Sequence, residues 1–172
     1  RGRVKAEGPV AAALSSIDNP LLVGDDVGAL LSGRVAERDA RWHLTRVTFD
    51  GGSLWLRDSG LPVGHAVRLR VLARDVSIAT HEPHDTSIQN HLPCTIESSA
   101  PDVHPSQVLV RVRVGASTLL ARITGRSLDA LDLQPGKRAW LQVKSVALLQ
   151  LALRFHAEPA RCLSRLRDLA CE

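Results

Sequence analysis

The 172-residue sequence is poor in aromatic side chains and in lysine. Tyrosine is absent, aromatic residues make up 3% of the chain, and the net charge of +4 comes almost entirely from arginine. Proteins that bind single-stranded nucleic acid stack bases on aromatic side chains, so we expect no nucleic-acid partner. No apolar run approaches the roughly 20 residues of a membrane-spanning helix. The three cysteines are odd in number and no two lie close together in the sequence, which favours a reducing cytosol over a disulfide scaffold.

Common catalytic and metal-binding motifs are also missing. The sequence has no G-x-x-x-x-G-K-[ST] loop for a nucleotide and no Gly-x-Ser-x-Gly elbow, so we expect this chain not to be an enzyme. His81 and His84 suggest a metal site, but they lack the i, i+4 spacing of helical ligands and Pro83 prevents a regular helix there. We interpret them as linker histidines and expect no metal.

The chain does contain an internal repeat. Residues 61–78 and 133–148 both begin with Leu-x-x-Gly and continue as an alternating strand. Each copy then has a cationic residue, a small polar residue and a valine: Arg74-Asp75-Val76 in the first and Lys144-Ser145-Val146 in the second. A repeat of this kind predicts two related β units.

The hydrophobic pattern places short strands in both units. Alternation predicts strands over 34–37, 44–49, 53–57, 67–71 and 76–79, and then over 92–98, 108–114, 118–123 and 139–146. Asp50-Gly51-Gly52 predicts a tight hairpin, and Thr124 is expected to cap a short helix over 125–131. Residues 21–31 are expected to form a short helix or a loop. The whole pattern predicts a mainly β protein with two small barrels that share strands.

The polar residues that remain could bind an anion. Hydroxyls, amides and a few cations suit a small tetrahedral dianion, which needs many directional donors and only partial neutralisation. The candidates are Ser87, Gln89, Asn90, Thr124, Arg126, Ser127, Lys144 and Ser145. The alternative is that Thr124 only caps a helix, Asn90 forms a turn and Lys144 faces solvent. Chemistry alone favours this alternative.

Four segments, taken in order, resemble a known family. They are Ser-Ile-Gln-Asn-His-Leu-Pro at 87–93, Leu-Ala-Arg-Ile-Thr-Gly-Arg-Ser at 120–127, Leu-Asp-Leu-Gln-Pro-Gly at 131–136 and Gln-Val-Lys-Ser-Val at 142–146. They resemble the Mop (molybdate-binding, TOBE-type) domain and, more closely, the C-terminal regulatory region of ModC, the ATP-binding subunit of molybdate ABC transporters. The resemblance covers about residues 33–149. Residues 1–9 resemble the end of an ABC ATPase domain.

The resemblance implies a fold and a domain organisation. We expect two OB-like (Mop/TOBE) small barrels with short helices at the termini. Residues 1–32 would be the tail of a preceding ABC ATPase domain and a linker, and 33–80 a first TOBE/OB-like unit. Residues 86–149 would be the Mop domain, and 150–172 a C-terminal helical tail.

The resemblance also implies a function. The chain would bind molybdate or tungstate between barrels through the eight candidate residues, form a homodimer and sense the intracellular oxyanion. Its partners would be an ABC ATPase domain and a transporter permease, in the cytoplasm against the inner membrane, and a full-length parent would be a molybdate-transporting ATPase. Stand-alone family members often carry Arg where this chain has Gln89. The alternative function is a structural dimerisation module that senses nothing.

The two copies of the repeat are expected to differ in role. The Asp75 carboxylate would repel an oxyanion, whereas Lys144 and Ser145 would attract one. We therefore expect the first unit to be structural or dimer-forming and the second to hold the anion.

Overall fold

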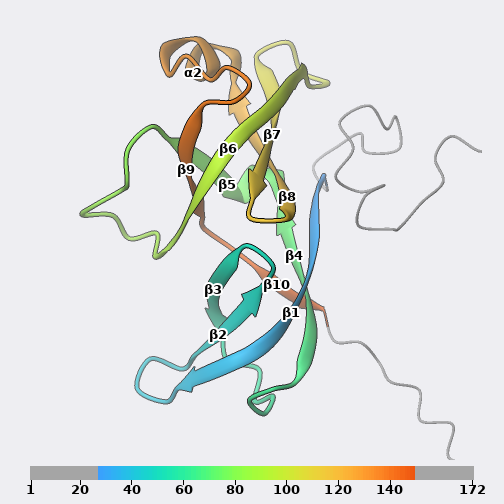
Figure 1. The fold of residues 1–172 in the computed structure, drawn as a ribbon, viewed down its shortest axis with the longest axis vertical. Helices are drawn as coiled ribbons and strands as arrows, with labels where there is room; N and C mark the ends of the chain where they lie inside the picture. The colour runs from blue at the N-terminus through green and yellow to red at the C-terminus, as the bar shows by residue number, and fades with distance from the viewer. Residues whose placement is uncertain (1–26, 150–172) are drawn as a thin grey trace, which may run out of the picture.

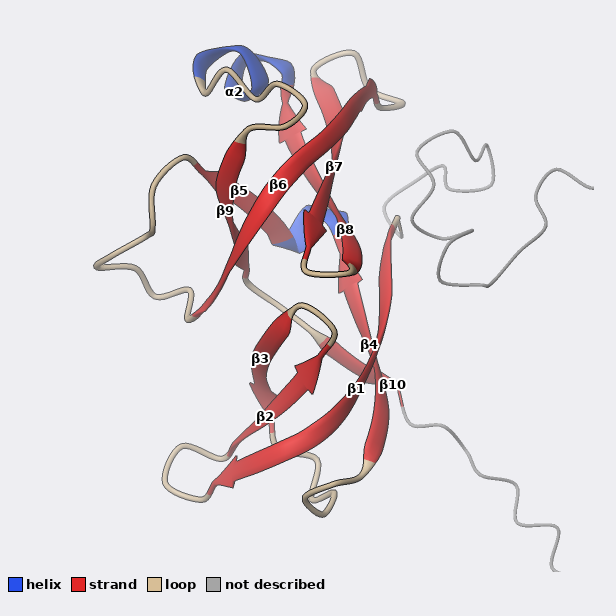
Figure 2. Ribbon diagram, viewed as in Figure 1, coloured by secondary structure: helices blue, strands red, loops and turns tan. Residues whose placement is uncertain are grey.

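The computed structural model describes residues 27–149, which form two five-stranded antiparallel sheets (Figures 1 and 2). In chain order the strands are β1 (Gly28–Asp39), β2 (Leu44–Phe49), β3 (Gly52–Arg57), β4 (Ala66–Leu72), β5 (Val76–Ala79), β6 (Asn90–Pro101), β7 (Gln107–Val114), β8 (Ser117–Thr124), β9 (Arg138–Val143) and β10 (Ala147–Leu149). A 3₁₀ turn, η1 (Ala73–Asp75), and a short helix, α2 (Gly125–Ala130), complete this part of the chain. None of its helices is long and apolar enough to cross a bilayer. The helices expected at the termini lie outside the described residues.

Each sheet contains one strand from the other half of the chain. The orders are β10-β4-β1-β2-β3 in the first barrel and β5-β9-β6-β7-β8 in the second. Strand β5 follows β4 in sequence but pairs with β9, where Val76 lies opposite Val143. Strand β10 follows β9 but pairs with β4, where Leu148 lies opposite Leu69. The predicted sharing of strands is confirmed, and it is reciprocal (Figure 1).

The Leu-x-x-Gly turns have the same geometry in both copies of the repeat. Gly64 and Gly136 both have φ of +87°, a left-handed conformation that favours glycine. The Gly64 N–H donates to the Val35 carbonyl at 2.7 Å, and the Gly136 N–H donates to the Ile96 carbonyl at 2.8 Å. The repeat seen in the sequence is therefore a repeat of structure as well.

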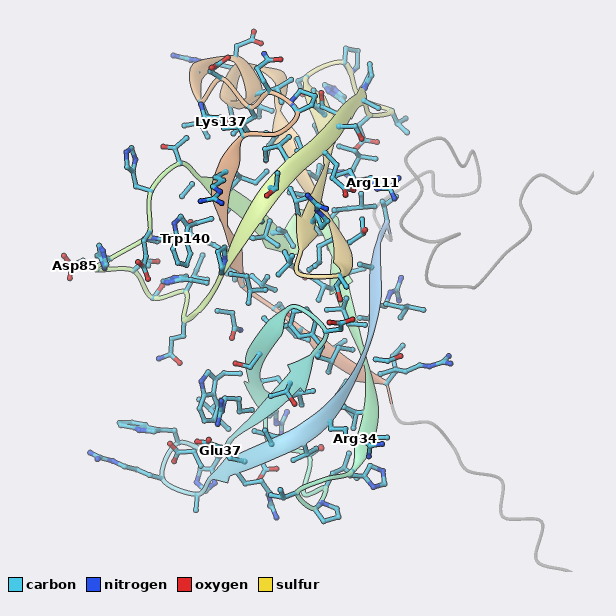
Figure 3. The ribbon with its side chains drawn as sticks, in the orientation of Figure 1. Arg34, Glu37, Asp85, Arg111, Lys137 and Trp140 are labelled. Carbon is cyan, nitrogen blue, oxygen red and sulfur yellow. The ribbon has the colours of Figure 1, made fainter. Side chains whose placement is uncertain are left out.

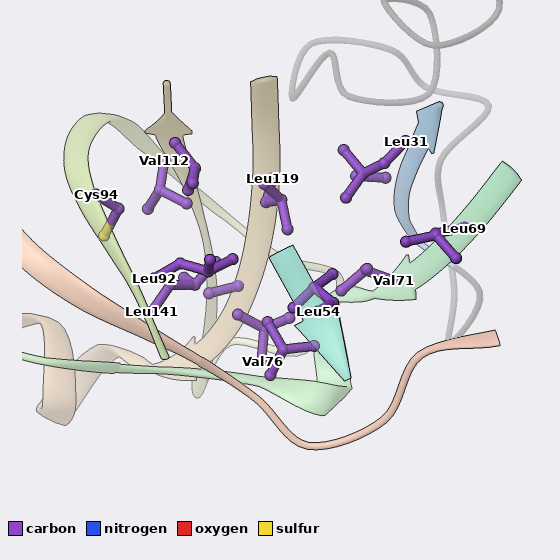
Figure 4. Close-up of a cluster of buried hydrophobic side chains, with 14 of the residues drawn as sticks. Leu31, Leu54, Leu69, Val71, Val76, Leu92, Cys94, Val112, Leu119 and Leu141 are labelled. Atoms are coloured by element: carbon purple, nitrogen blue, oxygen red, sulfur yellow. The ribbon is translucent and has the colours of Figure 1, made fainter. Parts of the chain in front are cut away.

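One large cluster of buried side chains extends through both barrels (Figure 4). It joins Leu54 and Leu69 of the first sheet to Leu119 and Leu141 of the second, all of which are fully buried. Burial of apolar area is the main stabilising contribution to a fold, at about 25 cal/mol per Å². Because the two barrels share this interior, we expect them to unfold together.

The hairpin tips of the two barrels touch through glycine. The predicted hairpin at Asp50-Gly51-Gly52 is confirmed between β2 and β3, and it meets the β7–β8 turn at Gly115 (Figure 1). A Cβ atom on Gly51 would lie 2.2 Å from the Val114 carbonyl oxygen, so no larger residue fits. The Ser117 hydroxyl donates to the Asp50 carbonyl at the same contact.

The connection from β3 to β4 is held by one carboxylate. Asp58 accepts hydrogen bonds from the Arg38 guanidinium, from the Thr45 hydroxyl at 2.7 Å and from the Gly60 N–H at 2.9 Å. The bond from Arg38, followed by those from Gly60 and Thr45, holds the pKa of Asp58 well below its usual range. In the second barrel α2 occupies the corresponding connection.

Two expectations about local structure are wrong. Gly28 to Leu31, expected in a helix or loop, belong to β1, because Ala29 and Leu31 pack inward while the strand pairs with β4. The strand expected over 139–146 ends at Val143. There the chain leaves the second sheet and crosses to the first, where β10 begins at Ala147.

Candidate functional site

A polar pocket of about 340 Å³ lies where the two barrels meet. We call it the junction pocket. Three segments line it: Leu44 and Trp55 of the first barrel, residues 87–90 at the start of β6, and Val143 and Lys144 at the end of β9. Four of the eight predicted site residues therefore come together here, namely Ser87, Gln89, Asn90 and Lys144.

Lys144 supplies the positive charge of the junction pocket. Its backbone N–H donates to the Asp75 carbonyl at 2.8 Å, which fixes the point where the chain leaves β9. The side chain is exposed, and within residues 27–149 no hydrogen bond or ion pair holds its ammonium group. An unpaired ammonium beside neutral donors is a suitable contact for an anion.

Asn90 ties the two barrels together at the wall of the junction pocket. Its carboxamide oxygen accepts from the Trp55 N–H at 2.7 Å, and its carboxamide nitrogen donates to the Trp55 carbonyl at 2.9 Å. Strand β3 is an edge strand, so the Asn90 side chain takes the place of a neighbouring strand at Trp55. The carboxamide NH₂ carries two hydrogens, which leaves one donor for a ligand.

The remaining predicted residues lie elsewhere. Thr124, Arg126 and Ser127 lie at the end of β8 that is far from the first barrel, where α2 begins (Figure 1). The Thr124 hydroxyl accepts from the Ser127 N–H at 3.1 Å, so the predicted helix cap is confirmed. Ser145 is exposed and follows Lys144 without lining the pocket.

Neither the histidines nor the buried thiol adds a second chemistry. Within the described part of the chain, no three His, Cys, Asp or Glu side chains are placed to hold a metal ion. Burial raises the pKa of the Cys94 thiol to about 11, so little reactive thiolate is present at neutral pH. The linker interpretation of His81 and His84 agrees with their exposure.

Sequence reasoning missed the contribution of the first barrel. Leu44 and Trp55 look like ordinary alternating strand residues, and no local motif marks them as part of a site. Their role depends on the contact between β3 and the start of β6, which Asn90 makes.

The same position in the other copy of the repeat is filled with apolar side chains. Val47 opposite Leu54 in the first sheet corresponds to Val112 opposite Leu119 in the second. By this register, Leu44 and Trp55 correspond to Leu109 and Leu120. Those two leucines form a separate buried cluster, which we call the apolar counterpart; its members are Val27, Ala73, Leu109 and Leu120.

Residues 86–150 match the TOBE domain family. This chain carries a TOBE domain. The match starts one residue before Ser87 and extends past Lys144, so it includes every predicted site residue.

The chain is similar to molybdenum import proteins. It is 51% identical over 149 residues to the molybdenum import ATP-binding protein ModC of Methylococcus capsulatus, covering 87% of this chain and 42% of that protein. It is 49% identical over 148 residues to ModC of Thiobacillus denitrificans, covering 86% and 41%. The resemblance to ModC is confirmed, and the chain spans about two-fifths of the length of these relatives.

A solved structure shares the fold of this chain. It is described as the cytoplasmic molybdate-binding protein ModG with molybdate bound, and it matches with a TM-score of 0.58 at 20% sequence identity. The match covers 69% of this chain and 93% of that chain. The expected mainly β fold with two OB-like barrels is thereby confirmed.

Proposed function

We propose that this chain is a regulatory domain that binds molybdate or tungstate for the ATP-binding subunit of a molybdate ABC importer. The observation that carries the proposal is the junction pocket, where Lys144 lies beside Ser87 and Gln89 with its charge unpaired among the described residues. Confirmed similarity to ModC supports the choice of oxyanion and of transporter. In the cell the domain would work on the cytoplasmic side of the inner membrane, with an ATPase domain and a permease as partners.

The donors of the junction pocket suit a tetrahedral dianion. One ammonium, from Lys144, neutralises part of the charge, and the Ser87 hydroxyl and Gln89 carboxamide can donate to the remaining oxygens. Because Gln89 is neutral, the site relies on directed hydrogen bonds more than on net charge.

We further propose that a second copy of the chain completes the site. Thr124, Arg126 and Ser127 are too far along the second barrel to reach the junction pocket of their own chain. In a homodimer this turn of one copy can face the pocket of the other, together with the exposed Ser145. An anion held between two copies would stabilise one arrangement of the dimer over another, which is what sensing requires.

The direct test is titration calorimetry of the chain with molybdate, tungstate, sulfate and phosphate. We expect molybdate and tungstate to bind most tightly. Replacing Lys144 with Ala should lower the affinity at least tenfold, because the charge-assisted bond is lost. Arg68→Ala, which removes an equal charge from the outer face of the first barrel, is the control and should leave the affinity unchanged. Absence of both heat and a thermal shift with molybdate would exclude sensing, and unchanged affinity in Lys144→Ala would exclude this pocket.

The second candidate function is a dimerisation module that binds no anion. Engagement of the Asn90 carboxamide by Trp55 favours it, because a residue expected to contact the ligand already has a structural role. Sedimentation analysis with and without molybdate separates the two functions. Strong self-association that does not respond to any of the four anions would support the structural module.

A further inference from the structure

A second hollow, of about 540 Å³, lies on the outer face of the second barrel. It is lined by the end of β5, the middle of β6, the start of β9 and the β7–β8 turn, and it shares no residue with the junction pocket. Its size is within the range of small-molecule sites, roughly 300 to 1,000 Å³. None of the predicted site residues belongs to it.

Two arginines flank one threonine at this hollow. Thr95 on β6 lies opposite Arg113 on β7 and also opposite Arg138 on β9. Residues opposite each other on antiparallel strands point to the same face, with their Cβ atoms about 5 Å apart. The neighbouring Cys94 and Ile96 are buried, so the row of three side chains faces outward. Thr95 therefore lies between the two arginines on this face of the sheet.

The positive charge of this row is poorly compensated. Glu97 contacts Arg113 at 3.8 Å, beyond hydrogen-bond distance. Glu97 lies closer to Arg111, at 3.1 Å. Arg138 makes no ion pair with any residue that the structure describes. Arg113 and Arg138 lie on β7 and β9, on either side of β6, and an anion held between them would offset their repulsion.

Flat rings form the adjacent wall of the hollow. Trp140 on β9 lies opposite Pro93 on β6, two residues along from the Thr95 pair, and both line the hollow. Figure 3 shows the half-buried Trp140 side chain on the side of the barrel where the loop that carries Asp85 extends. An indole face next to a proline ring can stack against a planar group. The hollow thus has cations at one end and rings at the other.

We propose that this hollow binds a nucleoside phosphate, with the phosphate between Arg113 and Arg138 and the base against Trp140. Guanidinium groups match phosphate oxygens with paired hydrogen bonds, and the Thr95 hydroxyl adds a third donor. The equivalent hollow of the first barrel has Arg34 and Arg68 but no indole, and Arg34 already donates to the Gly64 carbonyl at 3.0 Å. Of these two hollows, only the one on the second barrel therefore combines arginines for a phosphate with an indole for a base.

The test is a titration of the chain with AMP, ADP, adenosine or inorganic phosphate. Binding is measured by the change in tryptophan fluorescence and by the heat released or absorbed. AMP and ADP should bind, with phosphate weaker and adenosine weakest. The double substitution Arg113→Gln and Arg138→Gln should lower AMP affinity at least tenfold. Trp140→Leu should weaken AMP severalfold, measured by heat, and leave phosphate unchanged. Arg34→Gln with Arg68→Gln is the matched control on the first barrel.

The outcomes separate this site from the oxyanion site. Lys144→Ala should leave AMP affinity unchanged, and the Arg113 and Arg138 substitutions should leave molybdate binding unchanged. No AMP binding at millimolar concentration, or equal AMP affinity in the wild type and the double variant, would overturn the proposal. A different outcome is that the Arg113 and Arg138 substitutions lower phosphate affinity while Trp140→Leu leaves AMP affinity unchanged. The hollow would then be a simple anion site, and the assignment of the base to Trp140 would be overturned.

Discussion

The junction pocket and the apolar counterpart occupy equivalent positions in the repeat, but both polar and apolar side chains line the first, whereas only apolar side chains fill the second. By the shared register, Trp55 corresponds to Leu120, and Ile88 corresponds to Val27. Near the position of Lys144 in the pocket, the counterpart has the fully buried Ala73. One copy of the repeat thus gains stability at the place where the other copy keeps an opening.

The two crossings between the barrels account for this difference. In the first copy the crossing forms the 3₁₀ turn η1, and the Ala73 N–H donates to the Val27 carbonyl at 2.8 Å, which closes the cluster. In the second copy the chain turns away directly after Val143, and Lys144 is left at the rim. The Arg74-Asp75 pair that distinguishes the first copy in the sequence therefore belongs to a structural crossing.

The largest expected effect is on stability, from a pair of matched leucine substitutions. Leu109→Ala removes a buried side chain of the apolar counterpart and should cost about 3 kcal/mol of unfolding free energy. Leu44→Ala removes the equivalent, half-buried side chain of the junction pocket and should cost about 1 kcal/mol. Urea denaturation measures both. Equal losses would contradict the contrast between a filled and an open position.

The next effect concerns the contact between the barrels. Asn90→Ala removes both hydrogen bonds to Trp55 and leaves its N–H and carbonyl without partners, so we expect a loss of about 2 kcal/mol in unfolding free energy. Gln89→Ala, at the exposed neighbouring position, is the control and should change stability by less than about 0.5 kcal/mol. A loss in Asn90→Ala no larger than in the control would show that this contact does not hold the barrels together.

A smaller effect is expected on anion affinity. Ser87→Ala removes one neutral donor from the junction pocket and should weaken molybdate binding about fivefold, less than Lys144→Ala, because a neutral bond contributes less than a charge-assisted one. Ser77→Ala, on the exposed face of β5, is a hydroxyl control. Titration calorimetry measures all three. A larger loss in Ser87→Ala than in Lys144→Ala would reverse the assigned roles.

The smallest effect is expected from the carboxylate that holds the β3–β4 connection. Because the pKa of Asp58 is lowered in the folded chain, its contribution to stability is complete above its ordinary pKa of about 4 and is lost as the pH falls below that value. Asp58→Asn should therefore be slightly less stable at pH 7 and should lose less stability on acidification. Urea denaturation across the acid range tests this. Parallel curves for the two proteins would contradict it.

The sequence was most informative where a residue type has a local conformational reason. Asp50-Gly51-Gly52 requires a tight hairpin and Thr124 a helix cap, and both features were predicted. The shared Leu-x-x-Gly pattern then revealed the repeat. Of the candidate site, Ser87, Gln89, Asn90 and Lys144 could be brought together only through the family resemblance.

Features that depend on contacts distant in sequence could not be predicted. Gly28 to Leu31 resemble a loop until β4 lies beside them, and alternation alone does not show that the chain changes sheet after Val143. Asn90 resembled a turn residue or a ligand, whereas its partner Trp55 lies 35 residues earlier in the chain. No local pattern indicates such a pairing, so its structural role was missed.

The reciprocal exchange of β5 and β10 has a consequence for synthesis on the ribosome. Strand β4 is made early, but its partner β10 is the last strand of the described region, and β5 waits likewise for β9. Neither barrel can be completed before nearly all of this region has left the ribosome, and pairing between such distant segments is slow. During that interval the edges of β4 and β5 are exposed to other nascent chains. We therefore expect the nascent domain to associate with other chains more readily than the finished domain, in which these edges are paired.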